Sequence, residues 1–166
     1  MNLRPDPTFH ASPKLAMEAA VENYAFTVML SPDGAQSDGI AVIDLKLGSD
    51  TYGEIVHQVI VPNKGDEFHH FGWNACSSSL SPLSGHAFLE RRYLIVPGIR
   101  SSRIFIFDVK DPLKAHIHNI IEPDELFEKT GYSRPPPIHS GPQGLSVSPL
   151  ACGGAAGPDG PTGSFI

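Results

Sequence analysis

The residues of this chain that are best suited to chemistry gather in one short stretch. His69 and His70 are adjacent, Asp66 and Glu67 lie just before them, and Cys76 and the only tryptophan follow within a few positions. Neutral imidazole is the commonest metal ligand, and its second ring nitrogen needs a hydrogen-bond partner that fixes the tautomer. Imidazole clusters suit copper, zinc, iron and nickel. The stretch therefore predicts a transition-metal site at the two histidines, with the acids as their hydrogen-bond partners.

The backbone must place both imidazoles on one side if they are to share an ion. Adjacent residues of a regular strand face opposite sides of the sheet, so His69 and His70 can meet at one ion only from a loop or a bulge. The Lys-Gly-Asp sequence at residues 64–66 favours a loop. Without its neighbours, such a histidine pair is more often an exposed, hydrogen-bonded feature of the surface, so the context decides between the two interpretations.

The segments on either side of this stretch repeat each other. Residues 39–44 and 103–108 are apolar hexamers that end in Asp, 64 positions apart, and each leads through a polar turn and a β-branched strand to Pro and an acidic loop. The second acidic loop leads to His139, which takes the repeat position of His70. Residues 163–166 match the opening of a third copy, so we expect the chain to be cut inside a strand.

This repeat predicts the architecture. Repeats of about sixty residues with roughly four strands each are typical of a β-propeller. We therefore expect an N-terminal arm at residues 1–23 and an all-β, partial β-propeller domain at 24–166, with about two blades complete and a third begun. Because inner strands line the channel of a propeller, His70 and His139 are expected to converge at one mouth. Strands are predicted at 24–30, 39–45, 54–61, 74–80, 93–97, 99–109 and 115–121, helical turns at 14–20 and 123–128, a turn at 81–86, and an irregular loop at 149–163.

Composition narrows the classes of function. Gly and Pro make up 32 of the 166 residues, which suits short strands and many turns, and charged residues are only 18%. The net charge of −6 leaves no basic stripe for nucleic acid. We find no secretory signal and no apolar run long enough to span a membrane, so a cytoplasmic protein is expected. Cys76 and Cys152 are too far apart in a chain of this size to indicate a disulfide scaffold, and buried free thiols are expected.

Residues 66–78, which read Asp-Glu-Phe-His-His-Phe-Gly-Trp-Asn-Ala-Cys-Ser-Ser, resemble the most characteristic segment of the selenium-binding protein family, the methanethiol oxidases. The resemblance continues through residues 93–104 and 120–123 and covers residues 24–166. Members of this family are similar to seven-bladed propellers, so the chain would correspond to the amino-terminal third. The resemblance implies a copper-dependent oxidation of methanethiol, a small thiol, to formaldehyde, hydrogen sulfide and hydrogen peroxide, with selenium as a further ligand.

The family pattern carries over onto only some residues. His69 and His70 stand where the family has its paired histidines, which implies that they are copper ligands. Where the next family element reads Pro-His-Thr-x-His-Cys, residues 135–140 read Pro-Pro-Pro-Ile-His-Ser, so His139 keeps one histidine while the other histidine and the cysteine are replaced. Cys76 is then the one thiol through which selenium would be attached. The remaining ligands are expected outside this chain, and no catalytic residue is assigned.

Three interpretations remain open. The chain is part of a methanethiol oxidase that is catalytic only when complete, a short protein that binds copper or selenium without turnover, or a remnant with no biochemical role. Two blades and part of a third cannot close a ring, and open sheet edges invite pairing with other chains. Self-association through these edges is therefore expected.

Overall fold

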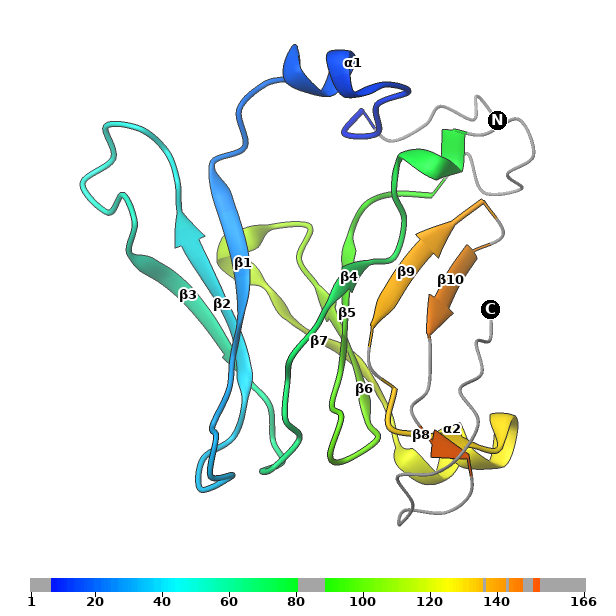
Figure 1. Ribbon diagram of the computed structural model, residues 1–166. Helices are drawn as coiled ribbons and strands as arrows, with labels where there is room; N and C mark the ends of the chain where they lie inside the picture. The colour runs from blue at the N-terminus through cyan, green and yellow to red at the C-terminus, as the bar shows by residue number, and fades with distance from the viewer. Residues whose placement is uncertain (1–6, 81–88, 136, 143, 148–150, 153–166) are drawn as a thin grey trace.

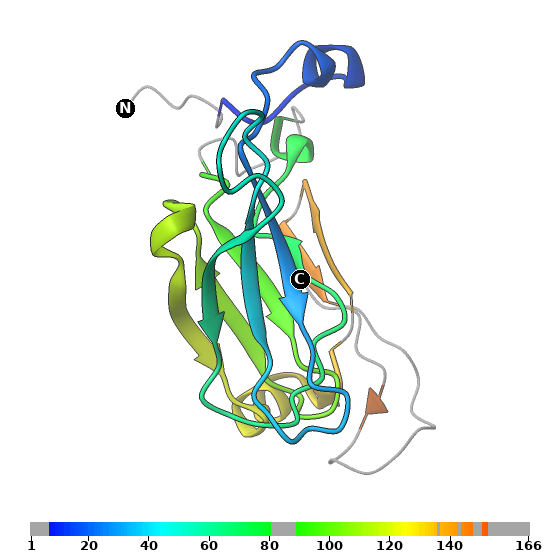
Figure 2. The same ribbon diagram turned by 90° about the vertical axis from the view of Figure 1, so that its left-hand side faces the viewer.

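Small antiparallel sheets follow one another along the chain and stand side by side (Figure 1, Figure 2). The structure, a computed structural model, describes residues 7–80, 89–135, 137–142, 144–147 and 151–152. The strands of the first two sheets are β1 Tyr24–Met29, β2 Gly39–Asp44, β3 Ile55–Ile60, β4 Gly72–Trp73, β5 Tyr93–Pro97, β6 Ile104–Asp108 and β7 His116–Ile121. They pair in the orders β1-β2-β3 and β4-β5-β6-β7. The later strands are β8 Tyr132–Ser133, β9 Ile138–Gly141, β10 Gly144–Val147 and β11 Ala151–Cys152, with β9 paired to β10 and β8 to β11.

The two predicted hexamers form β2 and β6, and they occupy equivalent places in their sheets. Each pairs on one side with the preceding strand and on the other side with the following strand. The register on the second side shifts between Val42 and Ile43 in the first sheet, and between Ile106 and Phe107 in the second. These two irregularities stand at the same place in the repeat, so the repeat is one of backbone structure as well as sequence.

The second sheet is buried on both faces. On β6, Phe105 and Phe107 belong to the core shared with the first sheet, whereas Ile104 and Ile106 belong to the core shared with β9, β10 and the helix after β7. Successive side chains of a strand point to opposite faces, so one sheet contributes to two cores. Consecutive small sheets stacked face to face are the arrangement of propeller blades. The predicted all-β fold of propeller blades is confirmed.

The strand predicted at 74–80 is wrong in its placement. The strand is β4, two residues long, and a 3-10 helix, η1 (Ser77–Leu80), follows it. Asn74 explains the early end, because its side-chain Oδ1 accepts the backbone N–H groups of Arg92 and Tyr93 and its Nδ2 donates to the Glu90 carbonyl. A side chain that bonds the neighbouring backbone in this way competes with the strand ladder.

The strand predicted at 99–109 also begins later than expected, at Ile104. A tight turn fills the difference, in which the Ser102 N–H donates to the Gly98 carbonyl and the Gly98 N–H donates to the Arg103 carbonyl. Ser102 has a φ of +63°, which lies in the left-handed region that a strand residue does not adopt. This turn, residues 98–103, is called the arginine turn below, because Arg100 and Arg103 point from it toward the predicted site.

Two short helices frame the sheets, and both were predicted. The first, α1 (Pro13–Met17), begins after Ser12, whose side chain accepts the N–H of Leu15. The second, α2 (Pro123–Thr130), has proline in its first turn and ends at Gly131, which has a φ of +72°. Proline at the start and a left-handed glycine at the end are the preferred helix boundaries. A further 3-10 turn, η2 (Pro112–Lys114), joins β6 to β7.

The first sheet has one strand fewer than the second. Strand β1 pairs with β2 as β5 pairs with β6, and within the described part of the chain β1 has no neighbour corresponding to β4. The third sheet has already begun at β9, well before residues 163–166. The predicted turn at 81–86, most of the loop at 149–163 and the third copy at 163–166 lie outside the described residues. Self-association through open edges stays a prediction.

None of the helices in the described segments is long and apolar enough to cross a membrane.

Candidate functional site

The predicted metal-binding histidines lie on the segment that leads from β3 into β4. This segment, residues 64–71, is called the histidine loop below. Neither His69 nor His70 belongs to a strand, which confirms the predicted loop. Their ring centroids are 6.3 Å apart and both residues are exposed. The chain turns just before them at Gly65 and Glu67, which have φ values of +72° and +65°. A non-glycine residue in the left-handed region is uncommon and is concentrated at functional sites.

Glu67 joins the histidine loop to the arginine turn. Its Oε1 lies 3.0 Å from Nε2 of His69, and its Oε2 lies 2.7 Å from Nη2 of Arg100. The hydrogen bond to His69, together with the Arg100 guanidinium, holds the pKa of Glu67 below its ordinary value. With Glu67 ionised, Nε2 of His69 carries the hydrogen and donates it, so Nδ1 is the ring nitrogen that can accept a metal. The predicted role of Glu67 as a histidine partner is confirmed.

Asp66 has a different role from the one predicted. Its side chain is fully buried and its Oδ1 lies 3.1 Å from Nη1 of Arg103, whose Nε also donates to Glu122 at 2.8 Å. The backbone carbonyl of Asp66 accepts the Arg100 N–H, and a Cβ on Gly98 would lie 2.9 Å from that carbonyl oxygen. The contacts of Asp66 therefore fix the arginine turn against the histidine loop. Oδ2 of Asp66 is buried without a hydrogen-bond partner among the described residues.

Phe68 anchors the loop from its buried side. The Phe68 side chain is 1% exposed, and its ring packs against that of Phe105 in a T-shaped arrangement with a centroid separation of 5.1 Å. Its N–H donates to Oδ2 of Asp38 at 3.0 Å, and Oδ1 of Asp38 accepts the Ser31 N–H. Because Asp38 is itself buried, these bonds are shielded from water and hold the backbone next to His69 firmly.

His139 lies on β9, is exposed, and stands opposite Ser146 on β10. Strand β9 passes β4 so closely that a Cβ on Gly72 would lie 2.9 Å from the Ile138 carbonyl oxygen. Strand β9, which carries His139, thus lies beside β4, the strand that follows the histidine loop. Among the described residues, however, no three His, Cys, Asp or Glu side chains are placed to hold one metal ion. His69 and His70 form a pair, and the role of His139 as a ligand stays a prediction.

Cys76 lies between β4 and η1 and is half-buried. Its Sγ is 2.8 Å from Oγ of Ser78 and 3.6 Å from the backbone carbonyl oxygen of Ser140, the residue after His139. Burial acts to raise the pKa of the Cys76 thiol, but hydrogen bonds from the side chains of Ser140 and Ser78 outweigh it, so the pKa lies below its ordinary value. A lowered thiol pKa increases the thiolate fraction and with it the reactivity toward electrophiles and soft metals. The Cys152 side chain lies outside the described residues.

Copper, the metal that the family resemblance implies, fits the donor set in part. An imidazole nitrogen lies about 2.0 Å from a bound transition metal, so two rings on one ion are on the order of 6 Å apart or closer. The observed separation of 6.3 Å between the rings of His69 and His70 is at the outer limit of this range. Two imidazoles suit copper chemically, and further donors are needed to complete a coordination shell.

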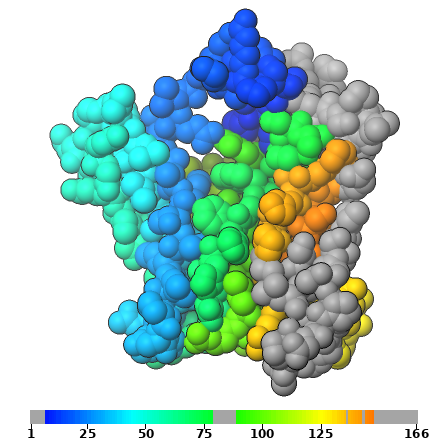
Figure 3. Space-filling view, in the orientation of Figure 1, coloured from blue at the N-terminus to red at the C-terminus, as the bar shows by residue number. Residues whose placement is uncertain are grey.

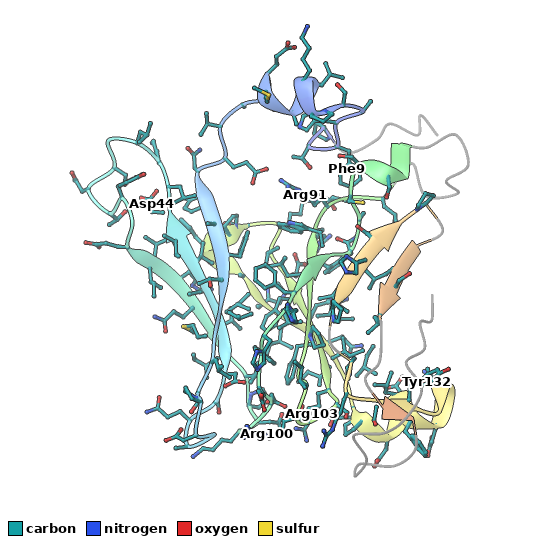
Figure 4. All side chains as sticks on the ribbon, viewed as in Figure 1. Phe9, Asp44, Arg91, Arg100, Arg103 and Tyr132 are labelled. Atoms are coloured by element: carbon teal, nitrogen blue, oxygen red, sulfur yellow. The ribbon has the colours of Figure 1, made fainter. Side chains whose placement is uncertain are left out.

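The contribution of the arginine turn to the site was not predicted from the sequence. Arg100 and Arg103 lie at one end of the sheets, away from Arg91 and Phe9 (Figure 4). Their link to the site could not be predicted, because the Arg103–Asp66 contact spans 37 residues of sequence. The available indication was Gly98, a glycine directly after a β-branched strand, which is typical of a close backbone approach.

Known proteins resemble this chain over most of its length. The model of the family described as 56kDa selenium binding protein (SBP56) matches residues 3–166. Selenium-binding protein 3 of Arabidopsis thaliana is 37% identical over 133 residues, which are 78% of this chain and 27% of that protein. A methanethiol oxidase of Danio rerio is 34% identical over 133 residues, 78% of this chain and 28% of that protein.

A solved structure agrees with the fold. The X-ray structure of a hypothetical selenium-binding protein from Sulfolobus tokodaii aligns with a TM-score of 0.84 at 47% identity, over 89% of this chain and 33% of that one. The chain therefore spans between a quarter and a third of the length of these relatives. The family match over residues 3–166, together with this structural agreement, shows that the chain belongs to the 56 kDa selenium-binding protein family.

Proposed function

We propose that this chain supplies the paired histidines of a copper-dependent methanethiol oxidase. The observation that carries the proposal is the pairing of His69 and His70 on one loop, with Glu67 bonded to His69 and Phe68 anchored in the core. A relative from Danio rerio is named methanethiol oxidase. The activity belongs to a longer chain, because the residues described here provide two imidazoles and a coordination shell needs more.

The reaction that we propose converts methanethiol, dioxygen and water to formaldehyde, hydrogen sulfide and hydrogen peroxide. Carbon is oxidised, dioxygen is reduced to peroxide, and the C–S bond is broken. Bound copper supplies the redox chemistry between the thiol and dioxygen. The residues of this chain orient the site: Glu67 fixes the tautomer of His69, and the buried contacts of Phe68 hold the loop at a constant distance from the sheets.

A chimera tests this proposal, in which the present chain replaces the matching segment of the Danio rerio methanethiol oxidase. The copper-loaded chimera is expected to form hydrogen peroxide and hydrogen sulfide when methanethiol and dioxygen are supplied, and the double variant H69A/H70A is expected to form neither. The 166-residue chain alone is expected to be inactive. A folded chimera that carries copper but makes no peroxide, or a double variant that keeps the full rate, would contradict the proposal.

A second function, binding without turnover, is favoured by one observation. The described residues contain two paired imidazoles but no three-donor group, while Cys76 has a thiol of lowered pKa. Chelation of copper at His69 and His70, with small molecules from solution as the remaining ligands, or uptake of selenium at Cys76, requires no redox turnover. Two results together would favour this function: copper stays with the 166-residue chain through dialysis, and the chimera forms no peroxide.

A further inference from the structure

A cavity of about 630 Å³ lies under the N-terminal arm, and none of its lining residues belongs to the histidine loop. The arm crosses above the ends of the first two sheets (Figure 1), and the hollow beneath it is visible in the space-filling view (Figure 3). Sites for small molecules in proteins usually measure about 300–1,000 Å³. Residues 19–23 of the arm and Tyr24 at the start of β1 form one wall, and residues in or next to β4, β5 and β6 form the other.

The floor of the cavity is aromatic and carries a fixed cation. The rings of Phe26 and Trp73 lie nearly perpendicular to each other, with centroids 5.8 Å apart and an interplanar angle of 87°. The Arg91 guanidinium carbon lies 4.8 Å from the centroid of Trp73. A guanidinium that lies over an indole ring is held in place by the cation–π attraction. A flat apolar group can lie against these rings, and an anionic group can pair with Arg91.

One anion that pairs with Arg91 in this structure comes from the arm itself. Oε1 of Glu22 lies 2.5 Å from Nη2 of Arg91, and the Glu22 side chain is 59% exposed whereas that of Arg91 is 22% exposed. The second ion pair in the wall, between Lys110 and Glu90 at 2.8 Å, is more open to solvent, with side chains 60% and 46% exposed. Exposed ion pairs add little net stability. A carboxylate from solution can therefore take the place of Glu22 at the most buried cation of the cavity.

We propose that this cavity binds a small organic carboxylate with a flat apolar body. The carboxylate pairs with Arg91, for which the planar guanidinium provides a matched fork of donors, and the apolar body lies against Trp73 and Phe26. Glu22 competes for the same guanidinium and so sets the affinity. This binding is separate from the proposed copper chemistry, since the cavity and the histidine loop share no residue.

The single tryptophan makes the test direct, because Trp73 lines the cavity and its fluorescence reports on a ligand bound there. The probe is phenylacetate, with the neutral phenylacetamide as its matched comparison, and binding is measured by tryptophan fluorescence and by calorimetry. We expect phenylacetate to bind and phenylacetamide to bind roughly tenfold more weakly or not at all, a ratio that corresponds to the loss of one ionic contact.

Three variants complete the test. E22Q removes the competing carboxylate and is expected to bind phenylacetate several-fold more tightly, whereas R91Q is expected to lose binding. E18Q changes an exposed acid of the same arm that does not line the cavity, and it is expected to match the unmodified chain. Unchanged affinity in E22Q, equal affinity for the acid and the amide, or no heat and no fluorescence change at millimolar phenylacetate would overturn the proposal, even if R91Q fails to fold.

Discussion

Oε1 of Glu67 lies 3.0 Å from Nε2 of His69, while the other oxygen of the same carboxylate is held by Arg100 at 2.7 Å. A carboxylate that bonds one imidazole nitrogen fixes the ring so that the opposite nitrogen is available, and it makes that nitrogen more basic. Glu67 adopts a left-handed backbone conformation to reach this position. The histidine loop is therefore pre-organised as far as His69 is concerned.

The substitution E67Q tests this relationship. Glutamine keeps the size of the side chain but removes the charge, so the affinity of the chain for copper is expected to fall by roughly 10- to 100-fold, as for other partners of metal-bound histidines. Copper affinity measured by competition with a chromophoric chelator gives the result. E128Q, at an exposed position of α2, is the matched control and is expected to change nothing. Equal affinities for E67Q and E128Q would show that Glu67 does not act on the metal.

The stability of the second sheet is expected to depend on pH through Asp108. Two Arg92 nitrogens bond one Asp108 oxygen, and chiefly this contact holds the pKa of Asp108 below its ordinary value. A carboxyl whose pKa is depressed by folding stabilises the folded state above the unfolded pKa, which is about 3.9 for Asp. This contribution is lost as the pH falls through the folded pKa.

The variant D108N removes this titration. The difference in free energy of unfolding between the unmodified chain and D108N, measured in urea, is expected to be full at pH 7 and to shrink steadily below about pH 4. D50N, at an exposed turn, is the control and should leave the pH profile unaltered. A difference that stays constant from pH 7 down to pH 2 would mean that Asp108 stabilises the sheet by packing alone.

Phe68 is expected to be the most sensitive aromatic residue of the histidine loop. F68A leaves a cavity against Phe105 and is expected to cost about 3–5 kcal/mol of unfolding free energy. F127A removes a phenylalanine that is 41% exposed on α2, and its cost is expected to be much smaller. Urea unfolding of both variants makes the comparison. Similar losses for the two would contradict the role of Phe68 as the buried anchor of the loop.

The reactivity of Cys76 is expected to depend on Ser78. S78A removes a hydrogen bond that lowers the pKa of the thiol, so the pH profile of its alkylation by iodoacetamide is expected to move to higher pH. The comparison is made in a C152S background, because the chain has two cysteines. An S78A profile that coincides with that of the parent protein would argue that Ser78 is only a neighbour of the thiol.

Much of the fold could be predicted because its pattern is local. The central strands β2 and β6 are buried on both faces and read as continuous apolar runs in the sequence. Strand β4 was misplaced because the side chain of Asn74 bonds backbone groups of residues 90–93, a contact that no local pattern reveals. The close approach of β4 to β9 likewise depends on Gly72 and the carbonyl of a residue in the next sheet.

The same distinction between local patterns and long-range contacts applies to the candidate site. The loop position of His69 and His70 and the partnership with Glu67 could be predicted, since all three lie within four residues. The support for the loop could not, because Asp38 bonds the Phe68 N–H across 30 residues and Arg103 reaches Asp66 across 37. Long-range contacts of this kind follow from the stacking of the sheets.

The central claim is that His69 and His70 hold copper, and the copper affinity of two double variants tests it most directly. H69A/H70A removes the pair, whereas H116A/H118A removes two exposed histidines from β7 and serves as the matched control. The affinity is measured by competition with a chromophoric copper chelator. Loss of a hydrogen-bond partner of a metal-bound histidine lowers metal affinity by up to roughly 100-fold, and H69A/H70A is expected to lose more than that. The copper affinity of H116A/H118A is expected to equal that of the unmodified chain. Full copper occupancy in H69A/H70A, or an equal loss in both variants, would contradict the assignment.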